Sequence, residues 1–271
     1  GIVVGNGMDS VIDHLLMLFT DSSSSIIDMN PTFIYYDYAA RRAGVEVIQV
    51  KRDAEFHIDA KTVLAAVQKN TKVVFLCSPN NPDGSVIELA TIEHLADNLN
   101  QKNIILFVDH AYIEFTDRKK YDAQVLVKKY SNVVVGYTFS KAYALAGFRV
   151  GYALMSKELQ AKYLSLITPF LCTRASIAAA KAALEDIEHM NKIVTNNERG
   201  RVFLSHELKQ LGYKVYDSQA NFLLFSGSQS SALVTEKLMA QGVIISAIPY
   251  VNDYTLRVTI ATEKENQKFI K

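Results

Sequence analysis

Up to about Tyr152, short runs rich in β-branched residues alternate with segments whose apolar residues recur at three-and-four spacing. This alternation is typical of parallel strands joined by crossover helices. The expected strands are Ser25–Asp28, Glu46–Val50, Lys72–Cys77, Ile104–Asp109, Asn132–Tyr137 and Arg149–Ala153. The expected helices are Met8–Phe19, Phe33–Ala43, Ala60–Gln68 and Glu88–Asn100. The pattern predicts an α/β fold with a mainly parallel sheet and helices on both faces.

The rest of the chain follows a different pattern: long helices come first, and we expect the tail after them to form a small α+β unit. Long helices are expected at Ser156–Ile167 and Ser176–Leu211. Short strands are then expected around a helix at Ala232–Gln241, namely Tyr213–Tyr216, Asn221–Phe225, Val243–Ser246 and Leu256–Ile260. We therefore predict a large domain over residues 1–186 and a small C-terminal domain over residues 187–271.

Charge and cysteine content narrow the class of protein. The 29 basic residues nearly balance the 28 acidic ones, so no overall field attracts nucleic acid or an anionic membrane. Cys77 and Cys172 are too few for a disulfide framework, no metal site is expected, and the apolar runs are too short to span a bilayer. We expect a cytoplasmic protein. The opening residues, Gly1 to Gly7, look like the middle of a fold, so an upstream segment is expected to be absent.

The segment from Thr138 to Arg149 carries the strongest chemical signal. It follows the strand predicted to end at Tyr137, and ligands of parallel sheets bind outside the carboxyl ends of their strands. Lys141 could condense there with an aldehyde if burial or neighbouring cations deprotonate its amine. The hydroxyls of Thr138 and Ser140 and the Arg149 guanidinium could bind a phosphate. A lone lysine more often begins a solvated helix, so this interpretation depends on companion residues.

Two loops offer such companions. Glycines precede the first predicted helix, so the backbone N–H groups of Gly7, Met8 and Asp9 could cradle a phosphate. Asn81 lies between two prolines after the strand ending at Cys77, which would aim its amide at the same crevice. Read alone, each loop is more often an ordinary turn.

Two charged residues lie within apolar strands. Asp109 ends a strand, and a buried carboxylate requires a cationic or hydrogen-bonded partner, such as a protonated pyridine nitrogen. Tyr112 is spaced to reach the same ligand. Arg257 lies in a strand of the tail, where it could face an interdomain cleft and hold a carboxylate or phosphate. The alternatives are an aspartate that caps a turn and an arginine on a solvated face.

Aromatic residues gather after the Ser25–Asp28 strand. Phe33 follows Pro31-Thr32 and could stack on a flat ring, although a lone aromatic more often belongs to the core. Tyr35, Tyr36 and Tyr38 follow closely, and the sequence does not separate ligand contact from packing for them.

Together these motifs resemble the pyridoxal-phosphate (PLP) dependent class I/II aminotransferases, and among them the histidinol-phosphate aminotransferases, from Gly5 to about Asn266. The resemblance implies the aspartate aminotransferase-like PLP transferase fold, a homodimer, and PLP held as a Schiff base. By this resemblance, Lys141 would form the Schiff base, Asp109 would bind the ring nitrogen and Phe33 would stack on the ring. Asn81 and Tyr112 would contact the ring hydroxyl. The phosphate would be bound by the side chains and helix-start amides of several residues: Thr138, Ser140, Arg149, Gly7, Met8 and Asp9. Lys141, Asp109 and Tyr112 would be catalytic, while Arg257, Asn81 and Asn221 would bind substrate.

Three single residues depart from the family pattern, as does the segment from Pro169 to Arg174. Ser246 stands where the family usually has an arginine that binds the substrate's anionic group. We hypothesise that Arg174 supplies the lost charge, whereas a surface arginine is the alternative. Asp83 replaces a usual threonine and His110 a usual glutamate, both at flanking positions where little effect on chemistry is expected.

The predicted function is transfer of an amino group between an anionic amino compound, with histidinol phosphate the best guess, and a 2-oxo acid such as 2-oxoglutarate. The alternatives within the family are decarboxylation of a phosphorylated amino acid, such as threonine phosphate, and transamination of aromatic amino acids. A non-catalytic protein that kept the fold is conceivable because of Ser246, but the Lys141 and Asp109 motifs argue against it. A nicotinamide-dependent oxidoreductase is disfavoured because no Gly-x-Gly-x-x-Gly joins a first strand to a helix.

Overall fold

The computed structural model describes residues 1–168 and 170–271. Its larger sheet has seven strands in the order β1-β7-β6-β5-β4-β2-β3. Five strands run parallel: β2 (Ser25–Asn30), β3 (Glu46–Lys51), β4 (Thr71–Cys77), β5 (Ile105–Asp109) and β6 (Val133–Thr138). Strand β7 (Val150–Leu154) runs antiparallel to β6 and to the edge strand β1 (Ile2–Asn6). The predicted mainly parallel α/β sheet is confirmed, and β1 is a strand that the sequence pattern missed.

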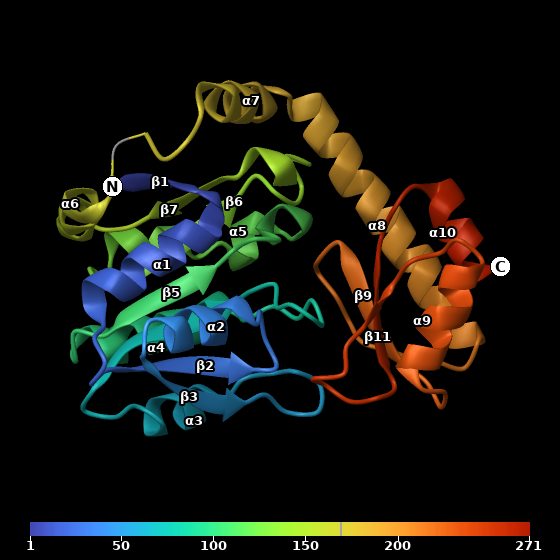
Figure 1. Cartoon of the computed structure of the whole chain (residues 1–271), viewed down its shortest axis with the longest axis horizontal. Coiled ribbons are helices and arrows are strands. Elements are labelled where there is room, and N and C mark those ends of the chain that lie inside the picture. Colours follow the sequence, from blue (N-terminus) through green and yellow to red (C-terminus); the bar gives the residue numbers. More distant parts are fainter. Residues whose placement is uncertain (169) are drawn as a thin grey trace.

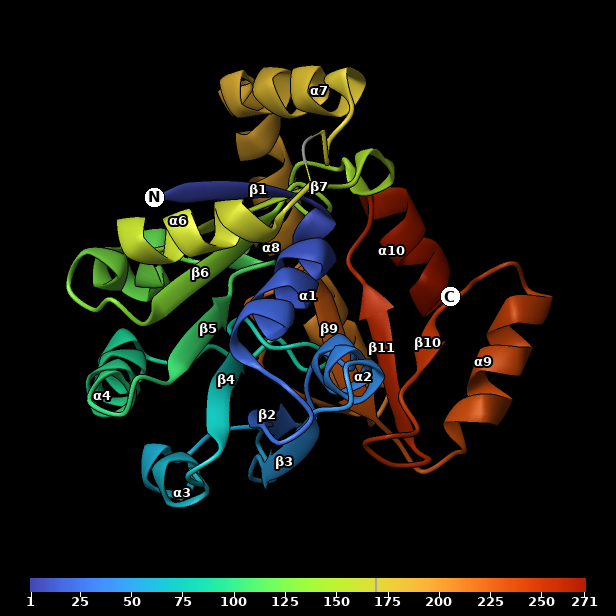
Figure 2. The ribbon, with the colours of Figure 1, turned by 60° about the vertical axis from the view of Figure 1, so that its left-hand side comes forward.

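Helices cover both faces of this sheet (Figure 1). One face carries α1 (Gly7–Phe19), α2 (Tyr35–Arg42) and α6 (Lys157–Leu166), and the other carries α3 (Ala60–Ala65), α4 (Leu89–Asn100) and the 3-10 helix η2 (Ala123–Lys128). In Figure 2, β4 and β5 lie between α1 and α2 on one side and α3 and α4 on the other.

The continuous apolar runs of the central strands have a direct cause in this layering. Along β4, Val73 and Phe75 pack into the core beneath α1 and α2, whereas Val74 and Leu76 pack beneath α3 and α4. Because successive side chains of a strand point to opposite faces, a sheet covered on both sides needs apolar residues at every position.

The second sheet is small and antiparallel, with the order β10-β11-β9-β8. Its strands are β8 (Lys214–Val215), β9 (Phe222–Ser226), β10 (Ser246–Ala247) and β11 (Thr255–Thr259). Its core includes side chains of α8 (Ile187–Gln210), α9 (Ser231–Ala240) and α10 (Glu263–Ile270). The prediction of a strand at Val243–Ser246 was wrong in extent, because only Ser246 of that range pairs with β11.

The single long helix predicted for Ser176–Leu211 is wrong. Two helices occupy this segment, α7 (Arg174–Glu185) and α8, and Asp186 separates them. The Asp186 side chain accepts a hydrogen bond from the His189 backbone N–H, so it caps the start of α8. Asp186 is also the predicted end of the large domain, and the division into two domains stays a prediction.

Short helical turns complete the fold: the 3-10 helices η1 (Ile113–Phe115) and η3 (Ala146–Phe148), and α5 (Arg118–Tyr121). Among the helices of the described residues, none combines the length and the apolarity needed to cross a bilayer.

Candidate active site

The carboxyl ends of β4, β5 and β6 lie level with one another. Cys77 pairs with Asp109, and Asp109 pairs with Gly136, so the loops that follow these strands open at one edge of the sheet. A cavity of about 200 Å³ lies there. Most of the predicted site residues line it: Met8, Asp9, Phe33, Asn81, Asp109, Tyr112, Thr138, Ser140, Lys141 and Arg149. Three further lining residues, Cys77, Ala111 and Ala146, carried no signal in the sequence.

One part of this lining combines two hydroxyl groups, a guanidinium group and the start of a helix. The Thr138 hydroxyl donates to Ser140 Oγ at 3.0 Å and accepts from the Ser140 backbone N–H at 3.1 Å. Arg149 Nη2 donates to Asp9 Oδ2 at 2.8 Å. Asp9 belongs to the first turn of α1, where backbone N–H groups lack partners within the helix. These donors suit an anion such as a phosphate group.

Gly7 supports this region in a different way from the one predicted. Its N–H donates to the Arg149 carbonyl at 3.0 Å, so it is not a free donor for a phosphate. Gly7 has φ of +77°, and a Cβ at this position would overlap the Arg149 guanidinium. Only glycine therefore lets Arg149 approach the start of α1 this closely. The expectation that Gly7 offers its amide to the ligand needs correction, whereas Met8 and Asp9 line the cavity.

Asp109 is a buried carboxylate with two hydrogen-bond donors. Its side chain is 1% exposed, and Oδ1 accepts from the Ala111 backbone N–H at 2.9 Å. Oδ2 accepts from the Tyr36 hydroxyl at 2.5 Å. Burial raises the pKa of Asp109 to about 6, against the lowering effect of the Tyr36 hydrogen bond, the Ala111 N–H and the Lys141 charge. A cationic ligand group at this carboxylate would restore its charge.

Tyr36 is a functional candidate that the sequence could not single out. It is fully buried in the helix face formed with Ala39 and Ala40, a spacing that predicts only core packing. The available signal was chemical, because a buried phenol requires a hydrogen-bond partner.

Lys141 is prepared for nucleophilic chemistry by its surroundings. Burial lowers the pKa of its ammonium, and the positive charge of Arg257 lowers it further. Lys141 Nζ lies 5.3 Å from the centroid of the Tyr112 ring. Its amine therefore loses a proton more readily than that of an ordinary lysine, as condensation with an aldehyde requires.

Arg257 connects the second sheet to the cavity. It projects from β11, and its Nη1 donates to Asn81 Oδ1 in the loop after β4. Its guanidinium carbon lies 5.0 Å from the Phe222 ring centroid. Arg257 contacts a residue of the cavity lining, although it does not line the cavity itself. Ser246 is its direct partner across β10 and β11, so the position where the family usually has arginine lies beside Arg257.

Two other predicted substrate residues lie elsewhere. Asn221 is not part of the cavity lining, and its backbone carbonyl accepts a hydrogen bond from the Ile260 N–H at 2.8 Å. Arg174 is the exposed first residue of α7 and is not among the lining residues either. The structure therefore does not bring Asn221 or Arg174 to the cavity.

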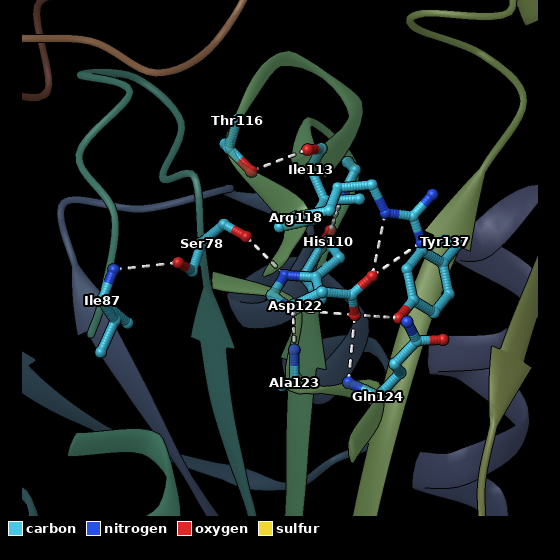
Figure 3. A network of polar contacts seen from close by, with 12 residues as sticks. Ser78, Ile87, His110, Ile113, Thr116, Arg118, Asp122, Ala123, Gln124 and Tyr137 are labelled. Carbon is cyan, nitrogen blue, oxygen red and sulfur yellow. Dashed lines mark hydrogen bonds and ion pairs between the residues drawn. The ribbon is translucent and has the colours of Figure 1, made fainter. Parts of the chain in front are cut away.

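The flanking position His110 fixes the loops around the site (Figure 3). Its ring is fully buried, with Nδ1 2.6 Å from the Ser78 carbonyl oxygen and Nε2 2.9 Å from the Ala123 backbone nitrogen. A carbonyl only accepts and a backbone N–H only donates, so Nδ1 carries the proton and the imidazole is neutral. Burial lowers the pKa of His110 in agreement with this form. His110 thus ties the end of β4 to the end of β5.

The other flanking departure, Asp83, also serves the loop after β4. Its carboxylate accepts hydrogen bonds from the Asn80 side chain and from the Ser85 backbone N–H. Asn80 in turn accepts from the Thr32 hydroxyl at 2.7 Å, which joins this loop to the segment before Phe33. Asp83 therefore stabilises the loop that carries Asn81.

A family model and curated relatives both match this chain, and they indicate the same family. A family model described as aminotransferase class I and II matches residues 1–271. A histidinol-phosphate aminotransferase of Methanococcoides burtonii is 39% identical over 274 residues, which cover 100% of this chain and 74% of that protein.

Solved structures agree with this family. The histidinol-phosphate aminotransferase of Clostridium acetobutylicum superposes with a TM-score of 0.92 at 26% identity, covering 100% of this chain and 81% of that one. The Sinorhizobium meliloti histidinol-phosphate aminotransferase, solved in complex with pyridoxal-5'-phosphate, gives a TM-score of 0.91 at 23% identity, covering 99% and 74%.

Proposed function

Because this chain belongs to the aminotransferase class I and II family and is a PLP-dependent aminotransferase, we propose that it binds PLP covalently at Lys141. We further propose that it moves an amino group from histidinol phosphate to a 2-oxo acid such as 2-oxoglutarate. One observation supports this cofactor site most strongly: Lys141, Asp109 and Arg149 line the same cavity.

The residues around this cavity suit PLP in their chemistry. Arg149 and the Thr138 and Ser140 hydroxyls would hold the phosphate, and the face of Phe33 would lie against the ring. Asn81 and Tyr112 would meet the ring hydroxyl. The buried Asp109 carboxylate would meet the ring nitrogen, where a positive partner offsets the cost of burying its charge. When bound, PLP supplies an electron sink for the charge that develops at the substrate Cα.

Three side chains of the protein have separate roles in the proposed reaction. Once the substrate amine has displaced Lys141 from the cofactor, Lys141 Nζ would be a free neutral amine that takes the proton from the substrate Cα and later returns a proton as general acid. Asp109 would hold the proton on the ring nitrogen. Arg257 binds the anionic group of the substrate and, through its bond to Asn81, aligns that group with the cofactor end of the cavity.

The substrate part of the proposal rests on the names of the relatives and on Arg257. Relatives with 33% to 39% identity are named histidinol-phosphate aminotransferases. Arg257 offers a fork of donors to a phosphate or carboxylate, while its neighbour Ser246 contributes a hydroxyl in place of a second positive charge.

The proposal extends to the organisation of the protein. The two separate sheets support a large cofactor domain over residues 1–186 and a small domain over residues 187–271. The family resemblance supports a homodimer, and the free thiols of Cys77 and Cys172 suit the cytoplasm.

A panel of amino donors tests the substrate assignment. The PLP-loaded protein is incubated with 2-oxoglutarate and one donor at a time: histidinol phosphate, phenylalanine, tyrosine or threonine phosphate. We expect glutamate to form fastest with histidinol phosphate. Release of carbon dioxide from threonine phosphate without glutamate would instead indicate a decarboxylase, and glutamate from the aromatic donors alone would indicate an aromatic aminotransferase. Either result would overturn the proposed substrate.

A further inference from the structure

Tyr36 lies directly against the carboxylate that the proposed function assigns to the ring nitrogen. It is 0% exposed, and its hydroxyl donates to Asp109 Oδ2 at 2.5 Å. Its ring stacks on Phe75, with centroids 4.8 Å apart and an angle of 11° between the planes. The edge-to-face contact with Phe33 has a centroid distance of 5.5 Å. These two ring contacts hold the buried phenol in place, with its hydroxyl on Asp109.

The hydrogen bonds of Asp109 indicate where the negative charge lies. Both partners, the Tyr36 hydroxyl and the Ala111 N–H, are donors, and an ionised carboxylate only accepts. Burial and the Asp109 charge raise the pKa of Tyr36 well above its usual value, so the phenol keeps its proton. A charge-assisted hydrogen bond of this kind stabilises the ionised form of a buried carboxylate.

We propose that Tyr36 is a positioning residue of the cofactor site, which orients the Asp109 carboxylate and keeps it ionised for the cofactor's ring nitrogen. This inference rests on the proposed role of Asp109. Tyr36 does not line the cavity, so it acts through Asp109 rather than on the ligand itself.

Other groups around Asp109 act on its charge without replacing Tyr36. Lys141, from the loop after β6, favours the ionised form, whereas Asp9 of α1 opposes it. Cys77 of β4 stays a neutral thiol because burial raises its pKa. The Tyr36 hydrogen bond is the largest influence that opposes the desolvation of Asp109. Its removal should therefore raise the pKa of Asp109.

Tyr36→Phe removes only the hydroxyl and keeps the packed ring. Tyr137→Phe is a matched control, because Tyr137 is also buried and its hydroxyl also donates at 2.5 Å to an aspartate, Asp122, outside the cavity (Figure 3). The dissociation constant of PLP from the apoprotein is measured between pH 5 and pH 9, and thermal unfolding of each apoprotein is recorded alongside.

We expect Tyr36→Phe to weaken PLP binding about tenfold at neutral pH, the effect of losing one hydrogen bond to a charged group. Affinity for the protonated ring is lost as pH falls through the pKa of Asp109, so this loss should begin at a higher pH in Tyr36→Phe than in the wild type. Tyr137→Phe should keep the wild-type affinity and pH midpoint even if its unfolding temperature falls.

The outcomes separate this inference from the function on which it rests. A wild-type protein that does not bind PLP would remove the proposed function itself. If the wild type binds PLP and Tyr36→Phe shows the same affinity and pH midpoint as the wild type and Tyr137→Phe, the proposed role of Tyr36 is overturned, while the proposed function stands. If Tyr36→Phe does not fold, 3-fluorotyrosine at position 36 replaces it, because its more acidic phenol is a stronger donor. The pH midpoint should then move to a lower pH, and an unchanged midpoint would overturn the inference.

Discussion

Lys141 and Asp109 line one cavity, and burial changes their pKa values in opposite directions. It lowers the pKa of the lysine and raises that of the aspartate to about 6, so both neutral forms become easier to reach. A lysine that loses its proton readily suits a general base at the substrate Cα. Asp109, in contrast, keeps its charge only with partners such as the Tyr36 hydroxyl and a cationic ligand group.

Replacement of Arg257 tests the substrate end of the site. Arg257→Ala should raise KM for an anionic donor about tenfold to a hundredfold, the range expected for losing a charge-assisted pair. Because the Arg257 charge lowers the pKa of Lys141, the rise of kcat with pH should also move to a higher pH. Steady-state kinetics across a pH series measures both effects.

Arg174→Ala is the control for this experiment, since Arg174 is exposed and outside the cavity lining. Its KM and pH profile should equal those of the wild type. An increase in KM as large as that of Arg257→Ala would show that Arg174 supplies the charge missing at Ser246, and would contradict its position away from the cavity.

At the scale of elements, the break at Asp186 illustrates how one side chain divides a helix. Asp186→Ala removes the cap of α8 and should lower the free energy of unfolding by about 1 kcal/mol. Chemical denaturation measures the change, with Glu188→Ala, an exposed residue of the same first turn, as a comparison. A loss no greater than that of Glu188→Ala would show that the cap does not stabilise α8.

The elements of the large sheet were predicted well because burial on both faces leaves a simple apolar pattern. Strand β1 was missed because it lies at the sheet edge, where Ile2 and Val4 are exposed and the run is interrupted by Gly5. Helix α10 was also missed, although Thr262 and Glu265 form a capping box whose spacing was visible in the sequence. Such errors arise where pairing and capping, rather than hydropathy, determine the structure.

At the scale of the whole molecule, the site depends on contacts between segments far apart in the sequence. The strand-end residues from Asn81 to Arg149 could be predicted because parallel strands bring their carboxyl ends together. The bond from Arg257 to Asn81 and the bond from Tyr36 to Asp109 could not, since they depend on how the second sheet and α2 pack. The position of Asn221 outside the cavity lining could not be predicted for the same reason.

Lys141 is the residue on which the proposed cofactor site depends most directly. Purified protein is loaded with PLP, reduced with borohydride and digested, and the peptides are analysed by mass spectrometry, with Lys141→Ala treated in parallel. We predict a visible absorption band that borohydride bleaches, one pyridoxyl adduct on Lys141, and neither band nor adduct in Lys141→Ala. An adduct on another lysine, or an equal band in Lys141→Ala, would show that Lys141 does not carry the cofactor.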